Sequence, residues 1–89
     1  MEKLKEEYIA SLKGKSFKIK EYINKRDLTK LKILIHSLKG SGATYGYPQI
    51  TILSSQMEKL IGKENWEGIN EVRRKMEALF YKIKPDKES

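Results

Sequence analysis

The chain has 89 residues, enough for one domain with a modest core and too few for a catalytic domain joined to a separate substrate domain. It has no cysteine, which excludes disulfides, thiolate nucleophiles and thiolate-bound metals, and which favours a reducing compartment. Its 19 basic and 12 acidic residues give a net charge of +7, which favours acidic partners.

No apolar run approaches the ~20 residues that a membrane-spanning helix needs. The first residues, MEKLKEEY, are too charged for the core of a signal peptide. We therefore expect a soluble, cytoplasmic protein that does not associate with membranes.

The first third of the chain predicts two helices. Apolar residues at helical spacing indicate a first helix from about residue 2 to residue 13, which Gly14 would end. Ser16 is a suitable cap for a second, short helix. The apolar positions of this short helix are Phe17, Ile19, Tyr22 and Ile23.

A third helix is predicted from Asp27, which is a good N-terminal cap. Its apolar stripe consists of Leu28, Leu31, Leu34, Ile35, Leu38 and Gly42. Ile33 would widen this stripe, so we expect the third helix to be central. Gly46 suits the position after a helix and Pro48 suits the first position of the next, which predicts a tight connection.

A fourth helix is predicted from Pro48 to Gly62, and a fifth after the cap Asn65, ending before Pro85. Short links between helices favour antiparallel neighbours. The expected fold is all-α: an antiparallel up-and-down four-helix bundle, with the first helix as an additional short element across one end. Residues 1–84 would form this single domain, and residues 85–89 a disordered tail.

The only histidine, His36, lies in the third helix within the run HSLKGSGATYG. In an antiparallel hairpin centred near residue 47, residues whose numbers sum to about 94 lie at the same height, because both helices rise equally from the turn. His36 then faces Glu58, and Gly40 faces Ser54. Since glycine costs about 1 kcal/mol inside a helix, Gly40 indicates that something approaches the backbone beside the histidine.

These residue types suit phosphoryl acceptance at nitrogen. A carboxylate such as Glu58 can hold one nitrogen of a neutral imidazole and leave the other as a nucleophile. Lys39, three positions after His36, and Lys32, four positions before it, can flank the ring. The ammonium groups and the Ser41 hydroxyl could stabilise phosphoryl oxygens.

The run HSLKGSGATYG, followed by a proline and a helix containing QMEKL, resembles a histidine-containing phosphotransfer (HPt) domain over residues from about 16 to 83. The resemblance implies that His36 takes a phosphoryl group from a receiver aspartate or a sensor histidine kinase and passes it to a response-regulator receiver. Glu58 would orient His36, and Lys39 would neutralise charge. The expected partner-binding residues are Lys32, Gly40, Ser41, Ala43, Ser54 and Ser55.

The same resemblance implies no cofactor and no metal of the chain's own, because the magnesium ion belongs to the receiver. No nucleotide-binding motif is present, so the chain is expected to be a monomeric phosphotransfer intermediate and not a kinase. Two other functions stay open. One is a basic helical module that binds nucleic acid, although the lysines are spread over several helices and interleaved with glutamate. The other is an adaptor that binds receivers without accepting a phosphoryl group.

Each candidate residue also has a purely structural interpretation. His36 could be a structural histidine beside an apolar stripe, and the lysines could be solvated surface residues. Glu58 could form a weak ion pair at the surface. The common register of His36, Lys39, Gly40 and Glu58 favours the functional interpretation.

Overall fold

The computed structural model describes the backbone of residues 2–83 and the side chains of residues 6–83. The predicted disordered tail, residues 85–89, lies outside the described residues. Within them the chain forms helices and no strands, so the all-α prediction is confirmed. The helices are α1 (Glu2–Asn24), α2 (Leu28–Thr44), α3 (Pro48–Gly62) and α4 (Trp66–Lys82).

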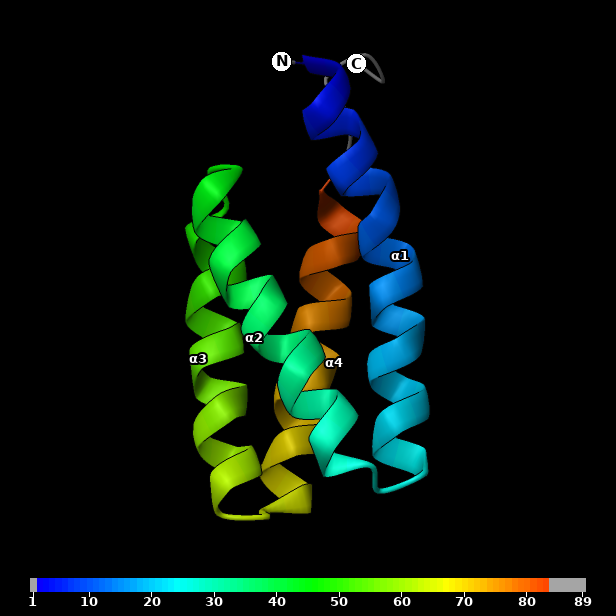
Figure 1. Cartoon of the computed structure of the whole chain (residues 1–89), viewed down its shortest axis with the longest axis vertical. Coiled ribbons are helices and arrows are strands. Elements are labelled where there is room, and N and C mark those ends of the chain that lie inside the picture. The colour runs from blue at the N-terminus through cyan, green and yellow to red at the C-terminus, as the bar shows by residue number, and fades with distance from the viewer. Residues whose placement is uncertain (1, 84–89) are drawn as a thin grey trace.

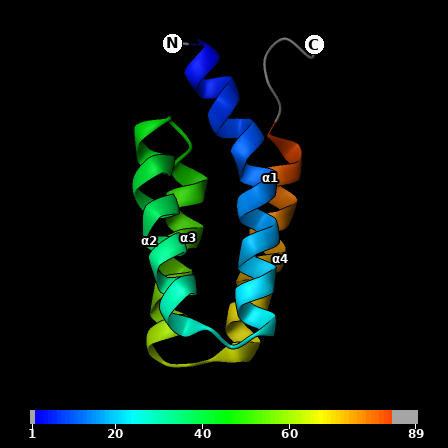
Figure 2. The ribbon, with the colours of Figure 1, turned by 45° about the vertical axis from the view of Figure 1, so that its right-hand side comes forward.

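Figure 1 shows the chain running down α1, up α2, down α3 and up α4. Each helix contacts the next one along the chain, and α4 also contacts α1. In the described part of the chain, the backbones of α1 and α3, and those of α2 and α4, do not approach each other closely, so the helices form a four-sided ring. Figure 2 shows its two halves, with α2 beside α3 on one side and α1 beside α4 on the other.

The predicted helix break at Gly14 is wrong, because α1 runs without interruption from Glu2 to Asn24. There is accordingly no additional short N-terminal helix. Buried residues on both sides of Gly14 form one continuous stripe, which consists of Tyr8, Leu12, Ile19 and Ile23. Burying one large apolar side chain contributes about 1.5–3 kcal/mol, whereas glycine inside a helix costs about 1 kcal/mol. The packing of this stripe therefore outweighs the local preference for a break.

The three connections share one backbone geometry. In each connection one residue adopts a positive φ: Arg26 at 57°, Gly46 at 84° and Glu64 at 52°. At Gly46 the backbone N–H donates to the carbonyl of Ala43, and the following N–H donates to the carbonyl of Gly42, at 3.3 and 2.7 Å. This hydrogen-bond pair is the Schellman motif, which ends a helix and reverses the chain within a few residues.

The starts of α2, α3 and α4 agree with the predicted caps, whereas the predicted cap Ser16 is wrong because it lies inside α1. The Asp27 carboxylate accepts a hydrogen bond from the backbone N–H of Lys30, and the Asn65 side chain accepts one from Gly68. Pro48 lies at the start of α3, where its missing N–H is not needed. Local sequence therefore determines where α2, α3 and α4 begin.

The core lies along the middle of the ring. Its buried apolar residues are Tyr8, Leu12, Ile19, Ile23, Leu31, Ile35, Leu38, Ile50, Met57, Ile61, Ile69, Val72, Met76 and Phe80. The prediction that Ile33 widens the apolar stripe of α2 is wrong, because Ile33 is exposed. It lies two residues after Leu31, which turns its side chain about 200° from the buried stripe.

Three tyrosines attach α1 to the turn between α2 and α3. The ring of Tyr8 stacks on that of Tyr45 with centroids 4.3 Å apart, and its centroid lies 6.1 Å from that of Tyr47. Burial raises the pKa of the Tyr8 phenol.

Across the described residues, none of the helices combines the length and apolar character needed to cross a membrane. The cytoplasmic location stays a prediction.

Candidate functional site

The candidate site lies where α2 and α3 pack together, and Gly42 allows their close approach. A Cβ atom at Gly42 would lie 2.9 Å from the Thr51 hydroxyl oxygen and 3.0 Å from the Ile50 Cβ, closer than side chains tolerate. The Thr51 hydroxyl donates a hydrogen bond to the backbone carbonyl of Lys39 at 2.9 Å. Gly42, a member of the predicted apolar stripe, is therefore a packing residue.

His36, Glu58 and Lys39 come together on the outside of this contact. The Nδ1 atom of His36 lies 3.1 Å from Oε2 of Glu58. The other carboxylate oxygen, Oε1, accepts a hydrogen bond from Lys39 Nζ at 3.2 Å. The His36 side chain is 77% exposed, whereas that of Glu58 is 23% exposed. The carboxylate is thus held between two partners, while the imidazole projects toward solvent.

Electrostatics select one tautomer of His36. The hydrogen bond from His36 lowers the pKa of Glu58, and the hydrogen bond and charge of Lys39 lower it further, against the opposing effect of burial. Glu58 is therefore ionised at neutral pH, and an ionised carboxylate can only accept hydrogen bonds. Nδ1 must then carry the hydrogen, which leaves the lone pair of a neutral imidazole on Nε2, at the other edge of the exposed ring.

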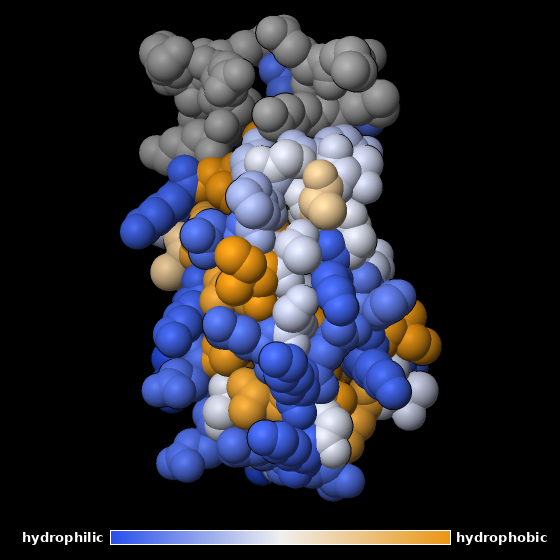
Figure 3. Space-filling model, turned by 90° about the vertical axis from the view of Figure 1, so that its left-hand side faces the viewer, coloured by the Kyte–Doolittle hydropathy of each residue, from blue (hydrophilic) through white to orange (hydrophobic). Residues whose placement is uncertain are grey.

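Several predicted partner-binding residues lie on the same two helices as His36 and Glu58. Lys32, Gly40 and Ala43 are exposed on α2, and Ser55 is half-buried on α3, one turn before Glu58. A Cβ atom at Gly40 would meet nothing within 4 Å, so no packing contact requires glycine at this position. Figure 3 shows the side of the molecule on which α3 lies in Figure 1, where hydrophobic patches are separated by hydrophilic surface.

Two predicted residues, Ser41 and Ser54, do not lie beside His36. The Ser41 hydroxyl is 3.0 Å from the Tyr8 hydroxyl and donates to the carbonyl of Leu38, so it faces α1. Ser54 is fully buried, and its hydroxyl has no hydrogen-bond partner in the structure. Four residues along a helix correspond to a rotation of about 40°. On α3 this rotation carries Ser54 into the core and away from Gly40.

Two exposed aliphatic residues on this half of the molecule, Ile33 on α2 and Ile52 on α3, were not among the predicted site residues. Ile33 lies three residues before His36, a spacing that places both on one side of the helix. That spacing is the signal that could have identified Ile33 as a surface residue. The hydrogen bond from the Thr51 hydroxyl to the Lys39 carbonyl was not predicted.

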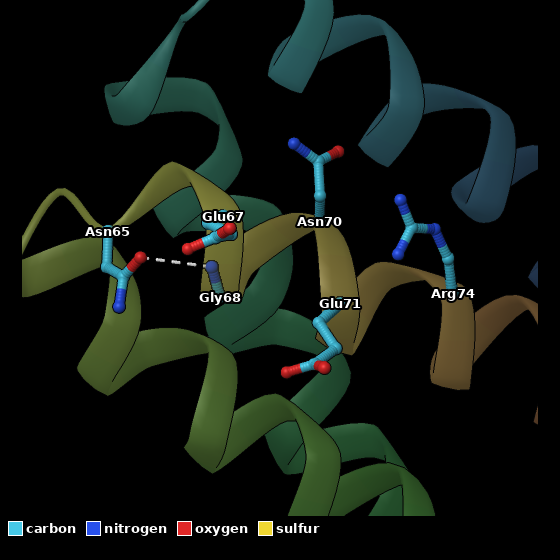
Figure 4. Close-up of a pocket in the computed structure, with 6 residues that line it drawn as sticks. All are labelled: Asn65, Glu67, Gly68, Asn70, Glu71 and Arg74. Atoms are coloured by element: carbon cyan, nitrogen blue, oxygen red, sulfur yellow. Dashed lines mark hydrogen bonds between the residues drawn. The ribbon is translucent and has the colours of Figure 1, made fainter.

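A separate hollow of about 520 Å³ lies at the first turns of α4. It is lined by Asn65, Glu67, Gly68, Asn70, Glu71 and Arg74, and none of these is a predicted site residue. Figure 4 shows the Asn65 side chain accepting the backbone N–H of Gly68 at 3.0 Å. This hydrogen bond belongs to the helix cap. In the described residues no three His, Cys, Asp or Glu side chains are grouped to hold a metal ion.

Comparison with known families gives one match. The family model of the Hpt domain matches residues 3–81, which span all four helices and include His36, Lys39 and Glu58. No curated protein and no solved structure gives a significant match. The match covers most of the chain, and the chain therefore belongs to the Hpt domain family.

Proposed function

We propose that Nε2 of His36 accepts a phosphoryl group from a receiver aspartate or a sensor histidine kinase and passes it to the aspartate of a response-regulator receiver. Hpt domains are phosphocarriers in two-component signalling, which gives this chain a general role in phosphotransfer. The observation that carries the finer proposal is the hydrogen bond between Nδ1 of the exposed His36 ring and the Glu58 carboxylate.

The geometry supports direct nucleophilic transfer. The Nε2 lone pair attacks the phosphorus of an aspartyl phosphate, the bond from phosphorus to the carboxylate oxygen breaks, and the carboxylate leaves with the electron pair. Nδ1 keeps its hydrogen, so the phosphorylated ring carries a positive charge. Glu58, already 3.1 Å from Nδ1, stabilises that charge. Transfer to the next receiver reverses these steps.

Lysines suit the negative charge of the incoming group. Lys39 Nζ binds Glu58 in the resting state, and its side chain is exposed enough to turn toward phosphoryl oxygens. Lys32 is exposed one turn before His36. An ammonium group beside a phosphoryl oxygen forms a charge-assisted hydrogen bond, which is roughly twice as strong as a neutral one.

The surface around His36 suits a partner that approaches closely. Gly40 and Ala43 are exposed and small, and Ile33 adds an exposed apolar side chain. We assign Lys32, Gly40, Ala43 and Ser55 to this docking surface and leave out Ser41 and Ser54. The acidic pocket of a receiver complements the lysines. The receiver supplies the magnesium ion, and this chain supplies the histidine without a cofactor of its own.

The proposal is tested by incubating the protein with a panel of receivers that carry labelled phosphate. We expect a protein-bound label that is stable in alkali and labile in acid, as a phosphoramidate is. His36→Gln should abolish the label and Glu58→Gln should slow its appearance, whereas Glu71→Gln, on the surface of α4, is the matched control and should retain the wild-type rate. Wild-type protein that stays unlabelled with every receiver would refute the proposal and leave an adaptor role. A label retained in His36→Gln would place the phosphoryl group on another residue.

A further inference from the structure

Two exposed aromatic residues lie outside the proposed phosphotransfer site. The large hydrophobic side chains that are exposed in the described part of the chain are Phe17, Ile33, Ile52 and Tyr81. Ile33 and Ile52 belong to the half of the bundle that carries His36. Phe17 on α1 and Tyr81 on α4 are more exposed, at 70% and 82%, and belong to the other half (Figure 2).

A groove between α1 and α4 lies beside these two aromatics. It has a volume of about 140 Å³ and is lined by Lys13, Ser16, Glu77, Phe80 and Tyr81. Phe17 is not itself a lining residue, but it lies one turn after Lys13, which is, so the two side chains are neighbours on α1. Apolar side chains of both helices thus lie at or near the groove.

The charge around the groove is positive. Glu77 is paired with Arg73 at 2.9 Å, and Glu21 with Lys25 at 3.1 Å, so two nearby carboxylates are already neutralised. Lys13 and Lys20 are exposed on α1, one turn before and one turn after Phe17, and Lys82 is exposed directly after Tyr81 on α4. A second copy of this chain would bring the same cations face to face, which is unfavourable. An acidic partner is complementary.

We propose that the groove between α1 and α4 docks an acidic amphipathic helix of a partner protein. Its apolar side chains would pack against Phe17, Phe80 and Tyr81, and its carboxylates would pair with Lys13 and Lys20. This surface is on the opposite side of the ring from the α2–α3 contact. A partner bound there leaves His36 accessible to a receiver, so the chain could bind both proteins at the same time. The inference does not depend on phosphotransfer.

The test is an NMR titration of the ¹⁵N-labelled protein with three synthetic peptides of equal length. The first repeats leucine and glutamate at helical spacing, the second has lysine in place of glutamate, and the third has serine in place of leucine. We expect only the first to bind, with amide shifts confined to residues 13–20 and 77–82. Phe17→Ala and Tyr81→Ala should each raise its Kd at least about tenfold, whereas Ile52→Ala, an exposed apolar control on α3, should change it less than twofold.

Other outcomes would overturn the proposal. Shifts that spread over all exposed lysines, or equal binding of the serine peptide, would show nonspecific charge attraction. Shifts centred on α2 and α3 would place binding at the His36 side. Binding to vesicles of phosphatidylglycerol and phosphatidylcholine, abolished by Phe17→Ala and without any response to the first peptide, would identify a membrane surface as the partner instead.

Discussion

The Thr51 hydroxyl of α3 donates a hydrogen bond to the backbone carbonyl of Lys39 in α2 at 2.9 Å, and the Lys39 ammonium binds Glu58 of α3 at 3.2 Å. Lys39 is therefore tied to α3 at both its backbone and its side chain. These two contacts hold the helices in the register that puts Glu58 beside His36, and Gly42 provides the room for Thr51.

Gly42→Ala should destabilise the fold by about 2 kcal/mol, because the added methyl group overpacks the contact with Ile50 and Thr51. Gly40→Ala is the matched control in the same helix. Its methyl group meets nothing within 4 Å, so the better helix propensity of alanine should raise the free energy of unfolding by up to about 1 kcal/mol. Urea denaturation of both variants gives the two values. Equal changes in the free energy of unfolding of the two variants would show that Gly42 is not a packing residue.

Gly40→Leu should leave the fold intact and slow phosphotransfer by at least about tenfold, because a large side chain beside His36 holds the receiver away from Nε2. Transfer from a phosphorylated receiver under single-turnover conditions measures the rate. Lys59→Leu, an exposed position on α3, controls for a general effect of added surface leucine. A wild-type rate in Gly40→Leu would remove Gly40 from the docking surface.

The contribution of Glu58 to stability should depend on pH. The pKa of Glu58 in the folded protein is below its ordinary value of 4.5, chiefly because of the hydrogen bond from His36. A lowered carboxyl pKa means that the contribution is complete above the unfolded pKa and is lost as pH falls through the folded pKa. The difference in free energy of unfolding between wild type and Glu58→Gln should therefore shrink as the pH falls below the ordinary value of 4.5 and through the lower folded pKa. Glu64→Gln, an exposed glutamate outside the site, is the control. A constant difference for Glu58→Gln would contradict the hydrogen-bonded geometry.

Ser54→Ala should raise the free energy of unfolding by about 1 kcal/mol, because it removes a buried hydroxyl that has no hydrogen-bond partner. It should leave the rate of phosphotransfer unchanged, since Ser54 faces the core. Thermal denaturation and the transfer assay measure the two effects. Slower transfer at unchanged stability would return Ser54 to the functional surface.

Local signals predicted most of the fold. Asp27, Pro48 and Asn65 start helices where the sequence indicates, since caps and prolines act through the nearest few backbone groups. The predicted helix break at Gly14 was wrong because it depends on packing between helices and not on local signals. Whether a helix passes through a glycine depends on the packing of both its halves against other helices, and the residues around Gly14 do not carry that information.

At the candidate site, too, simple helix geometry predicted one part of the arrangement, and packing between the helices determined the rest. A count of heights along two antiparallel helices was sufficient to set Glu58 level with His36. Height along the helix does not include the rotation of about 40° that accompanies each step of four residues. Ser54 was therefore predicted to lie on the surface, whereas it lies in the core. The role of Gly42 depends on the distance between helix axes, which the sequence pattern of one helix does not contain.

The most direct test of the central claim is to find which nitrogen carries the phosphoryl group. The protein, with ¹⁵N-labelled histidine, is phosphorylated by a receiver and examined by ³¹P–¹⁵N correlation NMR. We predict a coupling from phosphorus to Nε2 of His36, with Nδ1 still bearing its hydrogen. A coupling to Nδ1, or phosphorus with no coupling to a histidine nitrogen, would contradict the role assigned to the hydrogen bond between His36 and Glu58.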